Sequence, residues 1–171
     1  LARALVRDAG HGGGVTVQAI TTNVAPVPRI ADKVAAALHE VGIHLDIRGF
    51  DDPPWWPYLY LEGSWQLAFQ GASARPHIHT LFLRDLVTGG SFNPGGFSSA
   101  RLDELVARGR ATVGLAEQKQ LYGEAQRIVH DEQAMLPLYA ADVFAGWRPG
   151  VKGFRPHPLG YVELHEVTID G

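Results

Sequence analysis

The chain has 171 residues, of which 46% are hydrophobic and 19% charged, and its formal net charge is −3. This composition is typical of a globular domain with one core, and the charge excludes the basic surface that nucleic-acid binding requires. The absence of cysteine excludes disulfides, a zinc ribbon and a thiol nucleophile, and no apolar run approaches the ~20 residues of a membrane-spanning helix.

The first seventy residues predict alternating helices and strands, from apolar spacing and from Gly and Pro positions. The expected elements are a helix over 2–9 ending at Gly10, a strand over 15–20, a helix from Pro28 to Gly42, a strand over 43–48, a helix capped by Asp51 or Asp52 with Pro53 and Pro54 in its first turn, and a strand over 65–69. Strands joined through helices by short links predict right-handed parallel crossovers, and hence an α/β layer.

The second part predicts helices joined by loops. A short helix is expected over 78–86 and a loop over 89–96. The next helix should be capped by Ser98 or Ser99, with Asp103 and Glu104 near its positive end. A long helix should follow, with an apolar stripe of Leu121, Tyr122, Ala125, Ile128 and Val129. From about residue 146 aromatic residues alternate with Pro and Gly, and no helical period remains.

Two motifs resemble those of enzymes but lack a required part. His11-Gly12-Gly13-Gly14 spells the oxyanion-hole string of some esterases, yet no G-x-S-x-G elbow accompanies it, so a glycine-rich turn is expected. His39-Glu40 followed by His44 resembles a zincin motif with one residue too many. Because the helix should end at Gly42, we expect His39 and His44 to be separate, solvated side chains.

His77-Ile78-His79 leaves two interpretations open. In an extended segment both rings point the same way and can meet one ligand or metal, whereas on a helix they diverge. A metal site normally needs three or four ligands, and no nearby carboxylate completes one. The alternative function is therefore a metal-dependent α/β enzyme that uses His77, His79 and Asp51, of which Asp51 is otherwise expected to be a helix cap.

Aromatic residues are concentrated in one segment. Six fall within fifteen positions: Trp55, Trp56, Tyr58, Tyr60, Trp65 and Phe69. Aromatic faces can stack on sugar rings or pack on peptide side chains in a binding cleft, and they also fill cores. Both uses stay open for each residue.

Several ordered segments carry a resemblance to a known family: SSARLDEL at 98–105, LYGEAQRIV at 121–129, MLPLY at 135–139, VKGF at 151–154 and PLG at 158–160. Together they resemble the bacterial extracellular solute-binding proteins of family 5, which serve ABC importers of peptides, nickel and oligosaccharides. The resemblance implies an α/β fold, a periplasmic-binding-protein type II-like lobe: a βαβαβ parallel or mixed sheet flanked by helices, then further helices and a C-terminal crossover segment. In the family, the MLPLY segment starts a strand that returns toward the hinge.

The resemblance also implies that the chain is one lobe of a larger protein. Leu1–Gly10 resembles a helix that lies well inside full-length members. Residues 1–146 are expected to be the C-terminal, distal lobe, incomplete at its N-terminus, and 147–171 a hinge-crossing tail that packs on the other lobe. Without that lobe, the apolar side chains of the tail should be exposed or held by a neighbouring copy.

The function implied is capture of a peptide-like, anionic or oligosaccharide solute by closure of two lobes about a hinge. The partners implied are this solute and a membrane ABC permease, and the location is periplasmic or extracellular with a membrane anchor. Family members of this kind catalyse no reaction and need no cofactor, so the resemblance predicts neither for this chain. It also predicts no metal in the binding site.

Ligands of open α/β sheets bind beyond the carboxyl ends of the strands, here including the loop 70–75. Peptide-binding members usually carry an acidic residue before a Pro in this loop, whereas this chain has Arg75-Pro76-His77. An arginine favours a carboxylate, phosphate or polyol, although Pro76-His77 also resembles a pair in some nickel-complex binders. The expected ligand-binding residues are Gln70, Ser73, Arg75, His77, Asn93 and Trp65.

Overall fold

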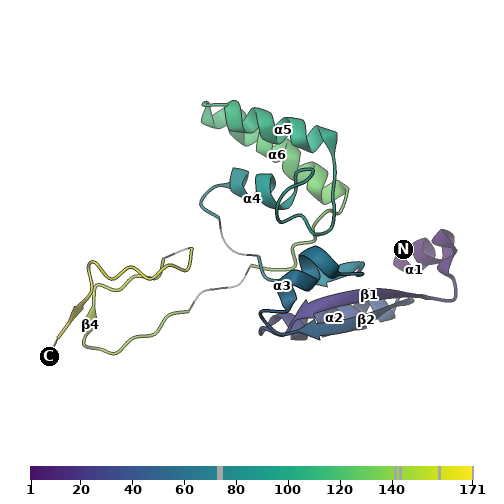
Figure 1. The fold of residues 1–171 in the computed structure, drawn as a ribbon, viewed down its shortest axis with the longest axis horizontal. Helices are drawn as coiled ribbons and strands as arrows, with labels where there is room; N and C mark the ends of the chain where they lie inside the picture. Colours follow the sequence, from purple (N-terminus) through teal and green to yellow (C-terminus); the bar gives the residue numbers. More distant parts are fainter. Residues whose placement is uncertain (73–74, 141, 143, 158, 171) are drawn as a thin grey trace. The chain divides into compact units, whose positions relative to one another are not determined.

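The computed structural model describes residues 1–72, 75–140, 142, 144–157 and 159–170, with Glu62 described by its backbone alone. Contacts divide the chain into two compact units, Leu1–Ala72 (unit 1) and Ser73–Gly171 (unit 2) (Figure 1). The division therefore falls at residue 72, whereas the sequence analysis places its boundary at 146. That residues 147–171 form a hinge-crossing tail stays a prediction.

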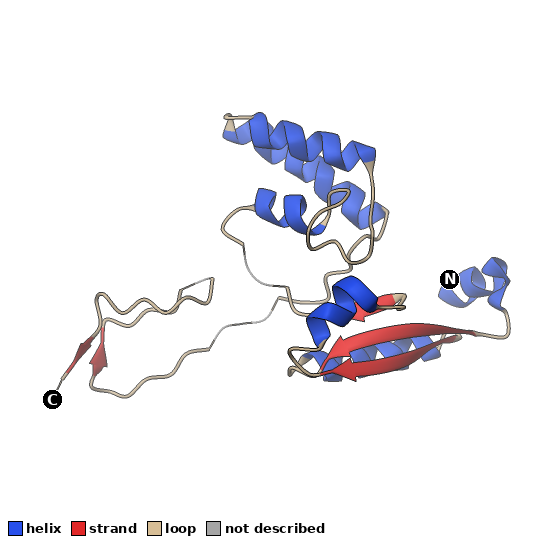
Figure 2. Ribbon diagram, viewed as in Figure 1, coloured by secondary structure: helices blue, strands red, loops and turns tan. Residues whose placement is uncertain are grey.

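Unit 1 is built on a three-stranded parallel sheet (Figure 2). The strands are β1 (Val15–Thr22), β2 (Ile43–Phe50) and β3 (Leu67–Phe69), in the order β2-β1-β3. β1 and β2 pair along their whole length, and both continue two residues beyond the predicted alternation. The parallel crossovers predicted from the sequence are confirmed, while β3 begins two residues later than expected.

One face of this sheet packs on α2 (Val27–His39), which carries Pro28 in its first turn as predicted. Ala31 of α2 is fully buried and clusters with Ala19 and Phe69 of the sheet. The helix ends at His39, and Gly42 takes a left-handed conformation, with φ +91°, before β2 begins. This conformation favours glycine, which explains why the chain turns there.

The other face is partly covered by α3 (Trp55–Pro57) and the π-helical turn η2 (Tyr58–Glu62). Trp55 and Leu59 bury their side chains against Ile20 and Phe50 of the sheet. The predicted cap is wrong: α3 has Pro54 at its N-cap and no capping side chain, so Pro53 and Pro54 precede the helix. Asp51 instead accepts a hydrogen bond from the side-chain amide of Asn23, at 2.9 Å.

The N-terminal segment of unit 1 is helical. It comprises α1 (Ala2–Val6) and the π-helical turn η1 (Arg7–His11). Gly10 adopts φ +88°, as expected for a glycine at the end of this helix. The glycine-rich turn expected at 11–14 follows, and it leads directly into β1.

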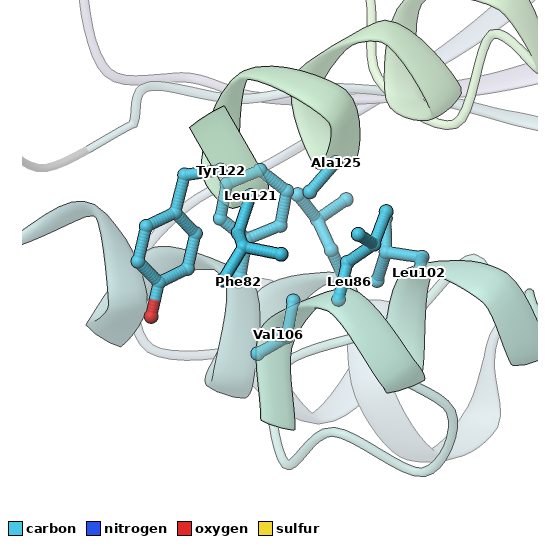
Figure 3. Close-up of a cluster of buried hydrophobic side chains, with 8 residues drawn as sticks. Phe82, Leu86, Leu102, Val106, Leu121, Tyr122 and Ala125 are labelled. Atoms are coloured by element: carbon cyan, nitrogen blue, oxygen red, sulfur yellow. The ribbon is translucent and has the colours of Figure 1, made fainter. Parts of the chain in front are cut away.

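Unit 2 contains the helices α4 (Ile78–Asp85), α5 (Ala100–Ala111) and α6 (Leu115–Asp131). They enclose a core of Phe82, Leu86, Leu102, Leu105, Val106, Leu121, Tyr122 and Ala125 (Figure 3). The apolar stripe predicted for the long helix is confirmed, because Ile128 and Val129 also pack against this core. The Tyr122 ring lies at the margin of the cluster, with its hydroxyl pointing away from the aliphatic side chains.

The start of α5 lies where the sequence predicts it, but its side chains act differently. Ser99 occupies the N-cap without a side-chain capping bond, while the Ser98 hydroxyl lies 3.0 Å from that of Thr88. Asp103, in the first turn, accepts the backbone N–H of Thr88 at 2.9 Å. Both contacts tie the loop after α4 to the beginning of α5.

The remainder of unit 2 has little regular structure. The strand that the resemblance implies from Met135–Tyr139 is not observed: this segment is irregular, and Leu136, Leu138 and Tyr139 are exposed. A strand needs a neighbouring strand to satisfy its backbone groups, and none pairs with these residues in the described part of the chain.

Two short strands, β4 (Val151–Lys152) and β5 (Thr168–Ile169), form an antiparallel pair within the closing segment. Trp147, Tyr161 and Leu164 of this segment are exposed. The Trp147 ring contacts that of Phe154, with 5.2 Å between the ring centres.

Candidate ligand-binding site

The carboxyl ends of β1 and β2, where a ligand is expected, are joined by direct contacts. Asn23 donates its backbone N–H to the Phe50 carbonyl at 2.8 Å and its side-chain amide to Asp51. A Cβ on Gly49 would overlap with the side-chain oxygen of Asn23, so the absence of a side chain at Gly49 lets Asn23 lie across β2. These contacts fix the carboxyl ends of β1 and β2 relative to each other, and the Asp51 carboxylate is already hydrogen-bonded to Asn23.

A groove of about 480 Å³ opens on the sheet face that α3 and η2 only partly cover. It is lined by Gln18, Ala19, Ile20, Arg48, Tyr58, Ser64, Trp65 and Gln66. The guanidinium of Arg48 lies 4.6 Å from the ring centre of Phe50 and 5.1 Å from that of Tyr58. An exposed guanidinium over aromatic faces suits a ligand that combines an apolar part with a carboxylate.

Trp65 forms one wall of this groove, so the structure brings this predicted residue to a cavity. Its indole N–H donates to the Leu59 carbonyl at 3.3 Å, which holds the ring against the buried cluster of Trp55 and Leu59. The ring thus has a structural role in the core as well as an exposed part.

The sequence analysis missed Arg48, Gln18 and Gln66 as lining residues. Gln66 extends the pairing of β1, because its side-chain oxygen accepts the backbone N–H of Gln18 at 2.9 Å. The position of Arg48 could have been predicted from the alternation of side chains in β2, which places Arg48 on the same face of the sheet as Phe50.

Two predicted residues come from the loop after β3. Gln70 is exposed, one residue beyond the end of the strand. Ser73 lies outside the described residues. The role of both as ligand contacts stays a prediction.

Arg75, in unit 2, lies partly buried beside Asp85, with 3.9 Å between the charged groups. Asp85 is closer to Arg84, at 3.1 Å. The Nε atom of Arg75 is buried and has no hydrogen-bond partner among the described residues. Because a guanidinium carries five N–H donors, Arg75 keeps donors available despite its ion pair.

The rings of His77 and His79, at the beginning of α4, each lie near that of Tyr122, with 6.0 and 6.1 Å between the ring centres. His77 is the N-cap residue, and its Nδ1 accepts the backbone N–H of His79 at 3.1 Å. The Nδ1 atom of His79 lies 2.8 Å from the Tyr122 hydroxyl. Both Nδ1 atoms are thus engaged within the protein, and the described residues contain no group of three or more potential metal ligands. The structure therefore adds no support to the metal-dependent enzyme.

Asn93 closes the loop between α4 and α5. Its side-chain amide donates to the carbonyls of Val87, at 3.1 Å, and Phe97, at 2.7 Å, and its side-chain oxygen accepts the Phe97 N–H at 3.1 Å. Both donors are used, so a ligand could reach only an acceptor position of this amide.

Acidification should destabilise unit 2 through His79. Burial, followed by the charges of Arg110 and His77, holds the pKa of His79 below its ordinary value of 6.5. The unfolded chain then binds more protons, so stability is complete above about pH 6.5 and decreases as the pH falls through that value. Burial raises the pKa of Tyr122, so its hydroxyl stays protonated over this pH range and shares a hydrogen bond with His79 Nδ1.

Melting temperatures of the His79→Gln variant, measured from about pH 8 to about pH 5.5, should depend less on pH than those of the unchanged chain. His130→Gln is the matched control, because the His130 side chain is exposed and pairs with its neighbour Asp131. Equal pH dependence in the unchanged chain and the His79→Gln variant would contradict this role of His79.

No family model matches the chain as a whole or in part. Heme-binding protein A of Haemophilus influenzae is 32% identical over 82 residues, which cover 48% of this chain and 15% of that protein. The dipeptide-binding protein of Escherichia coli is 25% identical over 99% of this chain and 33% of its own length. The matched part is thus a third or less of these curated relatives.

Solved structures share the fold over almost the entire chain. NikA from Staphylococcus aureus, in complex with Ni(L-His)2, aligns over 98% of this chain and 37% of its own, with a TM-score of 0.77 and 17% identity. Clavulanic acid biosynthesis oligopeptide binding protein 2 aligns over 99% of this chain and 33% of its own, with a TM-score of 0.82 and 20% identity. These structures show the α/β fold of a type II-like binding-protein lobe.

Among the described residues, no helix has both the length and the apolar character that crossing a lipid bilayer requires. The segment 98–105 spans the N-cap and the first turns of α5, and the segment 121–129 lies on α6. In sequence and in fold, the chain is thus similar to the bacterial extracellular solute-binding proteins of family 5.

Proposed function

We propose that the chain is part of a binding protein that captures a solute outside the cytoplasmic membrane and presents it to an ABC permease. The observation that carries this proposal is the alignment of 98–99% of the chain with solved solute-binding proteins. Capture proceeds by closure of two lobes about a hinge, with contacts from both lobes to the ligand. A membrane anchor on the complete protein belongs to the same proposal.

The solute proposed is anionic or polyhydroxylated. Arg75 supports this class, because its side chain is partly exposed and its ion pair with Asp85 is long, at 3.9 Å. Arg48 supports it independently in unit 1, where its guanidinium lies exposed in a groove with an aromatic wall. Guanidinium groups favour carboxylates and phosphates, which they bind with two parallel hydrogen bonds.

Roles are proposed for the predicted residues separately in each unit. Gln70 and Trp65 would contact the solute from unit 1, and Arg75 and His77 from unit 2. Asn93 would mainly hold the loop between α4 and α5, since both of its side-chain donors are used there. Binding of a metal complex through His77 remains a second candidate, and the fold shared with the Ni(L-His)2 complex of NikA favours it.

The test uses the complete product of the gene, purified from source cells without unfolding. Native mass spectrometry should show a bound solute that is released on denaturation, and the solute should carry a carboxylate, phosphate or several hydroxyl groups. The ligand-free protein should then be stabilised against heat by that solute. The proposal fails if no solute is retained and if no dipeptide, sugar acid or metal–histidine complex raises the melting temperature.

Arg75→Gln in the complete protein tests the proposed ligand class. Losing a charged hydrogen bond costs about 1.5–3 kcal/mol, so the affinity for the retained solute should decrease about 10- to 100-fold. Calorimetry measures this, with Arg127→Gln as control because Arg127 is exposed on α6. If Arg75→Gln binds normally, Arg75 is not a ligand contact, whereas capture itself is judged by the solute on the unchanged protein.

A further inference from the structure

His39 and His44 form a contacting pair, which the sequence analysis did not expect. His39 lies in the last turn of α2 and His44 on β2, and the turn between them ends at Gly42. The two Nδ1 atoms lie 3.0 Å apart, and the ring centres are 4.7 Å apart with 70° between the ring planes. In the metal-free chain one Nδ1 donates its proton to the other.

This arrangement has the geometry of two neighbouring ligands on one metal ion. Two imidazole nitrogens about 2.0–2.1 Å from an ion lie about 2.8–3.0 Å apart at a ligand angle of about 90°, and about 3.3–3.4 Å apart at the tetrahedral angle. The ring centres, each about 1.1–1.2 Å beyond its nitrogen, would then be about 4.5 Å or about 5.2 Å apart, respectively. The observed 3.0 and 4.7 Å are closer to the values for 90°.

The backbone around the pair sets the direction of the His44 ring. Its Nε2 atom lies against Gly14, where a Cβ would come within 3.2 Å of it. Gly14 also has φ +94°, so a glycine there both accommodates the ring and adopts the left-handed conformation. With Nε2 packed against this turn, Nδ1 is the nitrogen of His44 that faces His39.

We propose that His39 and His44 bind one divalent first-row transition-metal ion that accepts ligands at 90°, of the Cu²⁺ type, through their Nδ1 atoms. The ion replaces the proton that the two nitrogens share. The site lies near the amino end of β2, in unit 1, so it is separate from the carboxyl edge proposed for the solute and independent of that function.

The surroundings limit the affinity of this site. The described residues offer no third ligand close enough to complete the group, so water occupies the other positions. His39 and Glu40 line a groove of about 490 Å³ together with Arg3, Arg7 and His11. The positive charges of Arg3 and Arg7 oppose cation binding, and we expect a Kd on the order of micromolar.

The test is titration of the full chain with Cu²⁺ in a weakly coordinating buffer. Calorimetry should show one site, and electron paramagnetic resonance should show coupling to two imidazole nitrogens. His39→Gln and His44→Gln should each weaken binding at least about tenfold, which corresponds to about 1.4 kcal/mol, and leave coupling to one nitrogen. Both side chains are exposed, so the variants should keep the circular dichroism of the unchanged chain.

His130→Gln is the matched control, because His130 is an exposed histidine at a helix end outside the pair. This variant should bind Cu²⁺ within about twofold of the unchanged chain. The proposal is overturned if either pair variant retains full affinity, if His130→Gln loses as much, or if the unchanged chain shows coupling to fewer than two nitrogens. Electron paramagnetic resonance on the unchanged chain needs no variant, so it tests whether two imidazoles bind Cu²⁺ even if a substitution disturbs the fold.

Discussion

Replacing Phe82 with alanine should destabilise unit 2 by about 3–5 kcal/mol, the range for truncating a buried phenylalanine. Phe82 is only 1% exposed and belongs to the core formed by α4, α5 and α6. Its ring also stacks on Tyr122, with 5.8 Å between the ring centres. Urea unfolding followed by far-UV circular dichroism measures the loss, because most helical residues of the chain lie in these three helices.

Leu83→Ala is the control for this measurement, because Leu83 is the next residue on α4 and is 46% exposed. Its truncation removes little buried area, so the change should stay within about 0.5–1 kcal/mol. Equal effects of the two substitutions would mean that α4 does not bury Phe82 in solution.

Trp55→Ala should have an effect of similar size on unit 1, about 3–5 kcal/mol. Trp55 is 3% exposed and packs with Ile20, Phe50 and Leu59 beneath the start of α3. Its loss should also detach α3 and η2 from the sheet, because Trp55 and Leu59 are their buried contacts in this cluster. Hydrogen exchange of the β1 and β2 amides measures the effect within unit 1 alone.

Trp56 provides the comparison, since it neighbours Trp55 in sequence and is 46% exposed. Trp56 does not belong to the buried cluster, and it stacks on Tyr60, which packs against that cluster, with 5.9 Å between the ring centres. Trp56→Ala should therefore leave the amide protection of β1 and β2 within about tenfold of its original value, or about 1.4 kcal/mol. If Trp56→Ala lowered this amide protection more than Trp55→Ala does, Trp56 rather than Trp55 would be the residue that holds α3 on the sheet.

The sheet and the helices follow from local sequence patterns. The alternation in β1 and β2, the spacing of apolar residues in α2 and α6, and the glycines at 10 and 42 each specify one outcome. The start of α3 could not be predicted in the same way, because the Asp51 carboxylate can accept a hydrogen bond either from the helix N-terminus or from another side chain. A helix cap is a local contact, whereas the bond from Asn23 depends on the pairing of β1 with β2.

The segment 135–139 shows a second reason for a wrong prediction. The strand expected there rests on a resemblance to longer proteins, and a strand forms only where another strand completes its hydrogen bonds. In the described residues no such partner is present, and Leu136 and Tyr139 are exposed.

The candidate site was predictable only in part. The position of Trp65 at a cavity and of Gln70 after a strand follows from the order of elements. The contact between His39 and His44 does not, because it depends on the geometry of the turn that joins α2 to β2. The engagement of Asn93 by its own loop likewise depends on a fold of the backbone that its sequence does not encode locally.

Among the predicted solute contacts that the structure describes, Trp65 packs at the edge of one buried cluster, and none of the others belongs to a cluster. Substitutions at exposed positions such as Gln70 and His77 usually change stability by no more than about 0.5 kcal/mol. Mutation can therefore alter the chemistry of these positions while selection on folding acts on the clusters. Such a division would let one fold change its ligand specificity through substitutions of exposed residues while its buried clusters stay the same. The relatives named above, a heme-binding and a dipeptide-binding protein, differ in ligand as this separation would allow.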